Sequence, residues 1–307
     1  GGLPGRPRPP EPTQAALLAL GPQPSLGEVQ AVLAGSRQRK DPRAVAKWLA
    51  ALARERRGSA ALTVLEATRV FNLNANVFHY NQVLSACERS SHWQGGLALF
   101  LEMSKRSVAA DNFTCSSVIG TCSKGSAWQL ALQISRDMRR AGLKRDTVTF
   151  NTTISACEHG HLWATSLALL GEMDRDQVVR DTISYNAAMN ACKKAERWEA
   201  SVALFDAMAQ ERIPRSIISL SSVIAALGHG QHWQAALWHF REVGSKLRLD
   251  KVTYSCAITA CEKGRSWEMS VALLSEMLKR SVTTDSISFN AAIGACGASS
   301  EWTGALA

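Results

Sequence analysis

The sequence predicts an all-α solenoid, in which helix-turn-helix hairpins of 35 residues stack along the chain. Seven tryptophans recur at intervals of 35 residues, with one interval of 34; they are Trp93, Trp128, Trp163, Trp198, Trp233, Trp267 and Trp302. Six cysteines each stand six residues before a tryptophan: Cys87, Cys122, Cys157, Cys192, Cys261 and Cys296. Between these markers, apolar residues recur at the spacing of one helix face. A fixed period over many units is typical of stacked repeats.

Composition predicts a soluble protein without disulfides. Of the 307 residues 46% are hydrophobic, and no apolar run approaches the roughly 18 residues that a membrane-spanning helix needs. The six periodic cysteines occupy one helical position in successive units, about 10 Å apart, which suits neither a disulfide nor a metal site. We therefore expect free thiols, a reducing compartment, no cofactor or metal, and no membrane partner.

The net charge of +9 is weak evidence for a polyanionic partner, because it is unevenly distributed. Residues 1–76 hold eleven lysines and arginines against five acids, and therefore carry +6 of that charge. The repeats themselves are nearly balanced. Any electrostatic argument must rest on the position of a charge within the repeat.

The chain divides into three predicted segments. Residues 1–41 form a flexible, partly helical segment: residues 1–25 are rich in proline and glycine, and a short helix is possible over 26–33. Residues 42–76 read as a degenerate repeat or cap, and residues 77–307 as the repeat array. The array comprises repeat 1 (77–111), repeat 2 (112–146), repeat 3 (147–181), repeat 4 (182–216), repeat 5 (217–250), repeat 6 (251–285) and a truncated repeat 7 (286–307). The missing initial methionine and the end within a repeat favour a fragment of a longer protein.

Each repeat is predicted to contain two helices. The first begins after a hydroxyl residue that suits an N-cap, and the candidates are Thr114, Thr149, Ser184, Ser219, Thr253 and Ser288. It ends near a glycine that can adopt the left-handed conformation: Gly125, Gly160, Gly230 or Gly264. The second helix begins near the tryptophan and buries a face such as Trp198, Val202, Phe205 and Met208. A methionine column, Met103, Met138, Met173, Met208 and Met277, is interpreted as packing between repeats.

The phrases VTYSCAITACEKG, TVTFNTTISACEHG and TISYNAAMNACKKA resemble the pentatricopeptide repeat family, whose unit of 35 residues opens in this way and closes with aspartate. The resemblance covers residues 77–307 and extends in weaker form to 42–76. The uniform length of the repeats is similar to that of the P class of this family. The resemblance implies a right-handed superhelical solenoid that binds single-stranded RNA in a mitochondrion or chloroplast, one nucleotide per repeat, without enzymatic activity.

Three columns of residues are candidates for RNA binding. The second residues of the repeats are all apolar and would stack on successive bases: Phe78, Phe113, Val148, Ile183, Ile218, Val252 and Ile287. They precede the predicted helix caps, where the core of a hairpin does not require them. Packing between repeats would account for the same column.

The fifth and last residues of the repeats are candidate base selectors. The pairs are Asn81 with Asp111, Ser116 with Asp146, Asn151 with Asp181, Asn186 with Ser216, Ser221 with Asp250, and Ser255 with Asp285, followed by Asn290. An ionised aspartate only accepts hydrogen bonds, which favours U or G; asparagine suits a pyrimidine, whereas serine leaves room for a purine. In the resembled family these positions select the base, which implies the site 5'-UGUCGG-3' followed by a pyrimidine. Ordinary helix-start residues would give the same columns.

The thirteenth residues form a basic column: Arg89, Lys124, His159, Lys194, His229 and Lys263. These side chains would neutralise phosphates, although the same cations would equally offset the dipole at a helix end. Lys194 belongs to this column and Cys192 to the buried one, so Cys192 is predicted to be a packing residue and not a nucleophile.

The columns favour an RNA-binding protein that acts by occupancy: it would protect, remodel or help to process or translate a transcript, with a processing or translation factor as a further partner. Two other functions stay open. One is a protein-binding solenoid, and the other is the guide portion of a nuclease whose catalytic domain lies elsewhere. The sequence contains no cluster that suggests a small-molecule substrate.

Overall fold

The computed structural model describes residues 12–71, 73–244 and 247–299. Within these ranges the chain forms seventeen α-helices and no β-strand, which confirms the predicted all-α class. Contacts divide the chain into two compact units, Gly1–Arg145 and Asp146–Ala307. None of the helices in these ranges combines the length and apolar character needed to cross a bilayer.

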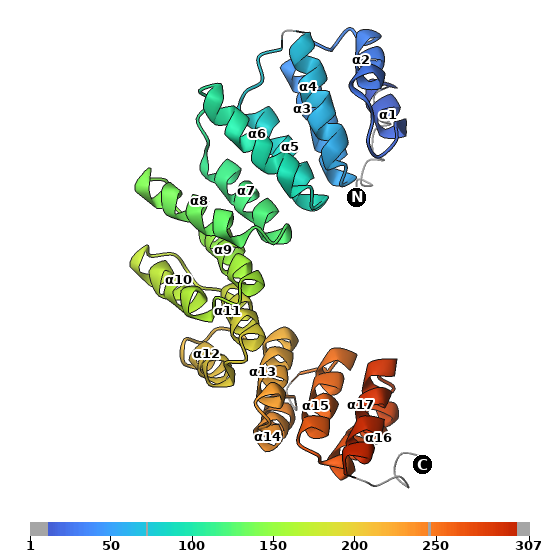
Figure 1. Cartoon of the computed structure of the whole chain (residues 1–307), viewed down its shortest axis with the longest axis vertical. Coiled ribbons are helices and arrows are strands. Elements are labelled where there is room, and N and C mark those ends of the chain that lie inside the picture. The colour runs from blue at the N-terminus through green and yellow to red at the C-terminus, as the bar shows by residue number, and fades with distance from the viewer. Residues whose placement is uncertain (1–11, 72, 245–246, 300–307) are drawn as a thin grey trace, which may run out of the picture. The chain divides into compact units, whose positions relative to one another are not determined.

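The helices follow one another as hairpins after two short N-terminal helices (Figure 1). The N-terminal helices are α1 (Pro12–Ala19) and α2 (Leu26–Ala34). The hairpins of the first compact unit are α3 (Pro42–Arg54) with α4 (Gly58–Val70), α5 (Val77–Arg89) with α6 (Trp93–Lys105), and α7 (Asn112–Lys124) with α8 (Trp128–Arg140). The second unit contains α9 (Thr147–His159) with α10 (Trp163–Arg175), α11 (Thr182–Lys194) with α12 (Trp198–Gln210), α13 (Ile217–His229) with α14 (Trp233–Gly244), α15 (Lys251–Lys263) with α16 (Trp267–Lys279), and α17 (Ser286–Ala298).

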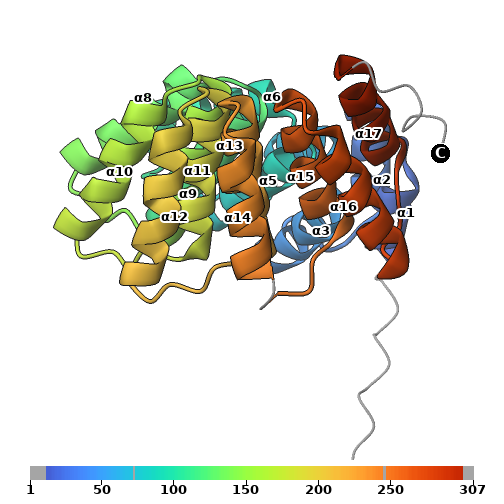
Figure 2. The same ribbon diagram turned by 90° about the horizontal axis from the view of Figure 1, so that it is seen from below.

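In each compact unit the first helices of consecutive hairpins form one layer and the second helices another. In the unit Asp146–Ala307, α9, α11, α13, α15 and α17 pack against one another in chain order. The second helices α10, α12, α14 and α16 each contact their own first helix and the first helix of the next hairpin (Figure 2). The first helices therefore form the layer on which a repeated surface can be built.

The N-terminal segment is more ordered than its composition suggests. The predicted helix over 26–33 is present as α2, which Ser25 caps. A further helix, α1, lies within the segment predicted to be flexible and partly helical; Leu17 on that helix is buried, and α1 packs against α2 and α3. Residues 1–11 lie outside the described ranges.

The predicted starting points of the first helices are wrong by three residues. Each first helix of repeats 2 to 7 is capped by the last residue of the preceding repeat, and these caps are Asp111, Asp146, Asp181, Ser216, Asp250 and Asp285. The Asp181 side chain, for example, accepts a hydrogen bond from the backbone N–H of Ser184, which stands at the third helical position. An aspartate can satisfy one of the free N–H groups of the first turn as well as a hydroxyl can. The serine or threonine at the third position is therefore not needed as the N-cap.

The predicted left-handed glycines at the helix ends are also wrong. Gly125, Gly160, Gly230 and Gly264 all have negative φ, and the residue that follows each of them has positive φ. The reason for glycine is space: a Cβ atom on Gly230 would lie 2.6 Å from Cδ1 of Trp198 in the preceding repeat. A Cβ on Gly264 would collide with Trp233 in the same way. These glycines let a tryptophan ring pack closely against the next hairpin.

The core contains the cysteine and methionine columns, as predicted. The six cysteines of the first column and the five methionines of the second have at most 2% of their surface exposed. The buried face of the second helices differs from the prediction, because Trp198 and Val202 are only half-buried. Small residues one position before Val202 and its counterparts are fully buried instead, and these include Ser166, Ser201 and Ser270. Their size lets the second helix approach its neighbours closely. Trp302 lies outside the described ranges.

Burial makes Cys192 unreactive, and this can be tested by alkylation. Removal from water raises the pKa of the Cys192 thiol to about 11, which leaves little of the reactive thiolate at neutral pH. We expect iodoacetamide at pH 8 to leave Cys192 unmodified in the folded protein and to modify it once guanidinium unfolds the chain. Peptide mass spectrometry measures both. Equal rates in the two states would contradict the packing role.

Candidate nucleic-acid interface

The fold brings the fifth and last residues of a repeat together, although they are 30 positions apart. The last residue caps the next first helix, and the fifth residue lies on the adjacent first helix. Asn81 Nδ2 lies 3.2 Å from both carboxylate oxygens of Asp111, and Asn151 Nδ2 lies 3.2 Å from Asp181 Oδ1. The corresponding distances are 3.4 Å from Asn186 Nδ2 to Ser216 Oγ and 3.4 Å from Ser255 Oγ to Asp285 Oδ1.

One predicted selector, Ser221, does not form such a pair among the described residues. Ser221 donates its hydroxyl to the carbonyl oxygen of Ile218 on its own helix, at 3.0 Å, and not to Asp250. Ser116 donates its hydroxyl to the carbonyl oxygen of Asn112 on its own helix, at 2.9 Å. Asn290 is exposed on α17.

Asp111 and Asp181 remain ionised while they cap helices. Partial burial on its own would raise the pKa of Asp111, but hydrogen bonds from the backbone and side chain of Thr114 and from Asn81 lower it below its usual value. The pKa of Asp181 is lowered by the same balance, with Ser184 and Asn151 as donors. A carboxylate offers about four acceptor positions, so capping one helix leaves capacity for another donor. At neutral pH these groups therefore present acceptors only.

The apolar second residues lie on the surface, within the first turn of each first helix and not before it. The exposed fractions are 55% for Phe78, 54% for Phe113, 59% for Val148, 62% for Ile183, 59% for Ile218, 49% for Val252 and 62% for Ile287. The fourth residues of the same helices, such as Tyr185, are buried. Packing between hairpins therefore does not account for the column of second residues, which leaves one apolar surface per repeat.

The basic thirteenth residues are exposed, but several are partnered. Each is the last residue of its first helix, where a cation also offsets the helix dipole. Lys194 Nζ lies 3.3 Å from Glu158 Oε1 of the preceding repeat, and Lys124 Nζ lies 3.6 Å from Glu88 Oε1. His229 Nδ1 lies 2.8 Å from Lys263 Nζ, and burial together with the charge of Lys263 lowers the pKa of His229. Arg89 and His159 are likewise exposed at the ends of α5 and α9.

One cavity joins members of all three columns. It has a volume of about 290 Å³ and lies between α13, α15 and α17. Its lining includes the apolar residues Val252 and Ile287, the pair Ser255 and Asp285, and the basic residues His229 and Lys263. A flat ligand in this cavity would meet apolar side chains of two successive repeats, a carboxylate acceptor and a cation.

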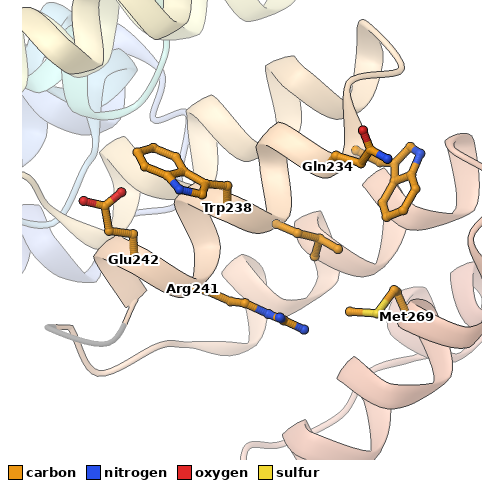
Figure 3. A pocket seen from close by; sticks show the side chains of 7 residues that line it. Gln234, Trp238, Arg241, Glu242 and Met269 are labelled. Carbon is orange, nitrogen blue, oxygen red and sulfur yellow. The ribbon is translucent and has the colours of Figure 1, made fainter.

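A second hollow, of about 620 Å³, contains none of these columns. It is lined by α14 and α16, with Trp238 and Arg241 on one helix and Met269 on the other (Figure 3). Trp238 is 58% exposed and interrupts the repeat pattern. The residues in register with Trp238 in other repeats are Ala98, Gln133, Ala168, Ala203 and Ala272. Among the described residues no group of three metal-ligating side chains lies close enough together to hold an ion.

The third residues have a role other than the helix caps predicted for them. Their hydroxyl groups are fully buried and several contact the fifth residue of the preceding repeat, for example Ser184 Oγ with Asn151 Oδ1 at 2.6 Å. The restriction of the third residue to serine or threonine in repeats 2 to 7 is the signal that could have revealed this.

Comparison with known proteins agrees with this architecture. The model of the pentatricopeptide repeat-containing proteins matches residues 112–243, and that of the single PPR repeat matches residues 78–108 and 252–282. No curated protein sequence matches the chain. The crystal structure of the pentatricopeptide repeat protein PPR10 from maize is 22% identical with a TM-score of 0.58, and the match covers 92% of this chain. The structure of PPR10 in complex with an 18-nt psaJ RNA element is 14% identical with a TM-score of 0.57, over 96% of this chain.

This chain spans 45% and 48% of the lengths of those two PPR10 chains. At these identities the likeness concerns the fold. The family models, by contrast, match more than half of the chain, in the same register as the repeats described above. The chain therefore belongs to the pentatricopeptide repeat family, as an all-α repeat solenoid.

Proposed function

We propose that this chain binds single-stranded RNA in a sequence-specific manner, with one nucleotide per repeat and the RNA parallel to the chain. The observation that carries the proposal is the cavity around Val252, Ser255 and Asp285, where an apolar surface, a selector pair and a cation converge. A related fold, PPR10, has been crystallised with an 18-nt RNA element. Base recognition on single strands uses this combination of stacking and hydrogen bonding at the base edge.

The proposed site is 5'-UGUCGG-3' for repeats 1 to 6, followed by a pyrimidine for repeat 7; the contacts in repeats 1, 3, 4 and 6 support four of these letters, and the others rest on the residue types alone. Repeats 1 and 3 hold asparagine and aspartate in contact, which suits the N3–H donor and the carbonyl acceptors of uracil. Repeat 6 holds serine and aspartate, which leaves room for guanine and accepts from its N1–H. Repeat 4 replaces the carboxylate with Ser216, whose hydroxyl can accept or donate, in agreement with cytosine.

The protein would act by occupancy in the processing, stability or translation of an organellar transcript, in a mitochondrion or a chloroplast. Binding by the side chains described above requires no bond to be made or broken. Microscopy of the protein with a fluorescent tag at its C-terminus tests the compartment. A signal confined to the cytosol would oppose the organellar role.

Binding of short RNAs tests the proposal directly. The purified chain is expected to bind a 12-nucleotide RNA that contains UGUCGG at least about tenfold more tightly than a scrambled RNA of equal composition, at moderate salt. Fluorescence anisotropy measures both affinities. A single-stranded DNA of the same sequence serves as a further control for the sugar. Indistinguishable affinities for the two RNAs would reject the proposed function.

A further inference from the structure

A column of buried hydroxyl groups lies behind the selectors. The third residues of repeats 2 to 7 are Thr114, Thr149, Ser184, Ser219, Thr253 and Ser288, and each has 0% of its surface exposed. Each lies in the first turn of a first helix, three residues after the cap. Burial places them out of reach of a bound base, so any influence on base selection must pass through another residue.

The asparagine selectors of repeats 1, 3 and 4 each accept a short hydrogen bond from a hydroxyl of the following repeat. Thr114 Oγ1 lies 2.6 Å from Asn81 Oδ1, and Ser184 Oγ lies 2.6 Å from Asn151 Oδ1. In repeat 4 the distance from Ser219 Oγ to Asn186 Oδ1 is 2.7 Å. These contacts join residues 33 positions apart. They are shorter than the 3.2 to 3.4 Å contacts between the asparagines and the last residues.

The chemistry of the partners determines which way the asparagine amide points. A carboxylate only accepts hydrogen bonds, so the amide group that faces Asp181 must be Nδ2. The opposite end, Oδ1, then meets the hydroxyl of Ser184, which can donate. The carbonyl of Asn151 is thereby directed toward a buried group, and its N–H toward the partly exposed Asp181. A base beside this pair would meet an N–H donor next to a carboxylate acceptor.

The serine selector of repeat 6, Ser255, also contacts the third-residue hydroxyl of the following repeat. Ser288 Oγ lies 2.7 Å from Ser255 Oγ and 2.8 Å from Asp285 Oδ1. In repeat 5 the selector does not contact this hydroxyl. Thr253 Oγ1 lies 2.7 Å from Asp250 Oδ1, whereas Ser221 donates to a carbonyl oxygen of its own helix. Thr253 therefore makes the capping contact without a contact to the selector of the preceding repeat.

We propose that the buried third-residue hydroxyls, with Ser184, Thr114 and Ser219 as the clearest cases, are positioning residues that orient the fifth-residue selector of the preceding repeat. The inference rests on the proposed RNA-binding function. A rotated amide would present its carbonyl oxygen to the base and would accept from the amino groups of C, A or G. The hydroxyl therefore sustains discrimination in favour of uracil in repeats 1 and 3.

The central experiment measures base preference at the third nucleotide of UGUCGG, which repeat 3 is proposed to read, for the parent chain and for Ser184→Ala. Four RNAs carry U, C, A or G at that nucleotide. We expect Ser184→Ala to reduce the preference for U over the other bases by roughly two- to tenfold, the effect of one lost hydrogen bond. Ser184→Thr should restore it, because Thr114 makes the same contact in repeat 1.

The matched control is Thr253→Ala, read at the fifth nucleotide. It removes a hydroxyl at the same place in the repeat and the same capping contact, but no contact to Ser221. We expect the preference for G at that nucleotide to stay within about twofold of the parent. An equal loss of selectivity in Thr253→Ala would show that helix capping, and not orientation of the selector, is responsible, and would overturn the proposal.

Two measurements keep the inference testable if Ser184→Ala folds poorly. Thr114→Val preserves the shape of the side chain without its hydroxyl, and should reduce selectivity for U at the first nucleotide while Thr114→Ser does not. Nuclear magnetic resonance needs no RNA: the Nδ2 protons of Asn151 should exchange more slowly with solvent in the parent than in Ser184→Ala. Unchanged selectivity in Thr114→Val, or unchanged exchange at Asn151, would overturn the inference.

Failure of this inference and failure of the proposed function are distinguishable. A parent chain that does not discriminate UGUCGG from its scrambled form contradicts the function. A parent chain that discriminates, with Ser184→Ala and Thr114→Val that discriminate equally well, leaves the function intact and contradicts only the role of the hydroxyls.

Discussion

The double substitution Ile183→Ser and Ile218→Ser is expected to weaken RNA binding about thirtyfold while the melting temperature stays within a few degrees of the parent. Both side chains are about 60% exposed, so their removal costs little packing energy in the free protein. In the complex each would cover the face of a base. A contact of this kind contributes roughly 1 kcal/mol at the lower end of the range for stacking, so two contributions multiply to about thirtyfold in affinity.

Val179→Ser is the matched control for this pair. Val179 is 78% exposed in the connection after α10, and it lies outside the three columns. Its replacement should change neither binding nor stability. Anisotropy titration and thermal unfolding on all three proteins give the comparison. If the double variant binds UGUCGG as tightly as the parent, the second residues do not contact bases.

The second prediction is an exchange of specificity between repeats 3 and 6. Asn151→Ser should move the preference at the third nucleotide from U toward G. Serine lacks the amide group of asparagine, and its shorter side chain leaves room for a purine beside Asp181. The reciprocal change, Ser255→Asn, should move the preference at the sixth nucleotide from G toward U. Each exchange replaces one hydrogen bond to a charged or polar partner, which corresponds to about tenfold in relative affinity.

Competition binding with RNAs that carry each base at the two nucleotides measures both changes. The two variants control for each other, because each should alter selectivity at its own nucleotide and leave the other unaffected. Selectivity that stays unchanged in both variants would contradict base readout by the fifth residue. A uniform loss of affinity would instead point to damage in the first helices.

Much of the fold was predictable because each structural unit is repeated. The period located the hairpins, and the cysteine and methionine columns identified the buried face. The helix ends were less predictable, because Asp181 and Ser184 are both good capping residues and local sequence does not choose between them. The left-handed conformation predicted for the glycines was wrong for a related reason. A left-handed turn and a close contact with tryptophan both favour glycine, and the sequence does not distinguish them.

For the candidate site, the columns themselves follow from the sequence, since residues at one place in every repeat must have equivalent surroundings. The exposure of Ile183 and the pairing of Asn151 with Asp181 do not follow from it. Ser221 and Ser255 belong to one column, and the hydroxyl of each lies within hydrogen-bond distance of a carbonyl oxygen of its own helix. Ser255 also lies next to Ser288 and Asp285. A short hydroxyl can turn to either partner, and the neighbouring helix decides.

The repeat pattern by itself specifies helical hairpins with a common buried face, because a periodic apolar stripe can be buried only by stacking equivalent units. Which polar groups meet is decided only when the hairpins stack. Asn151, Asp181 and Ser184 come from two repeats, and no local interaction brings them together. Their contact depends on the packing of α9 against α11, which places a helix cap and a buried hydroxyl beside the preceding selector.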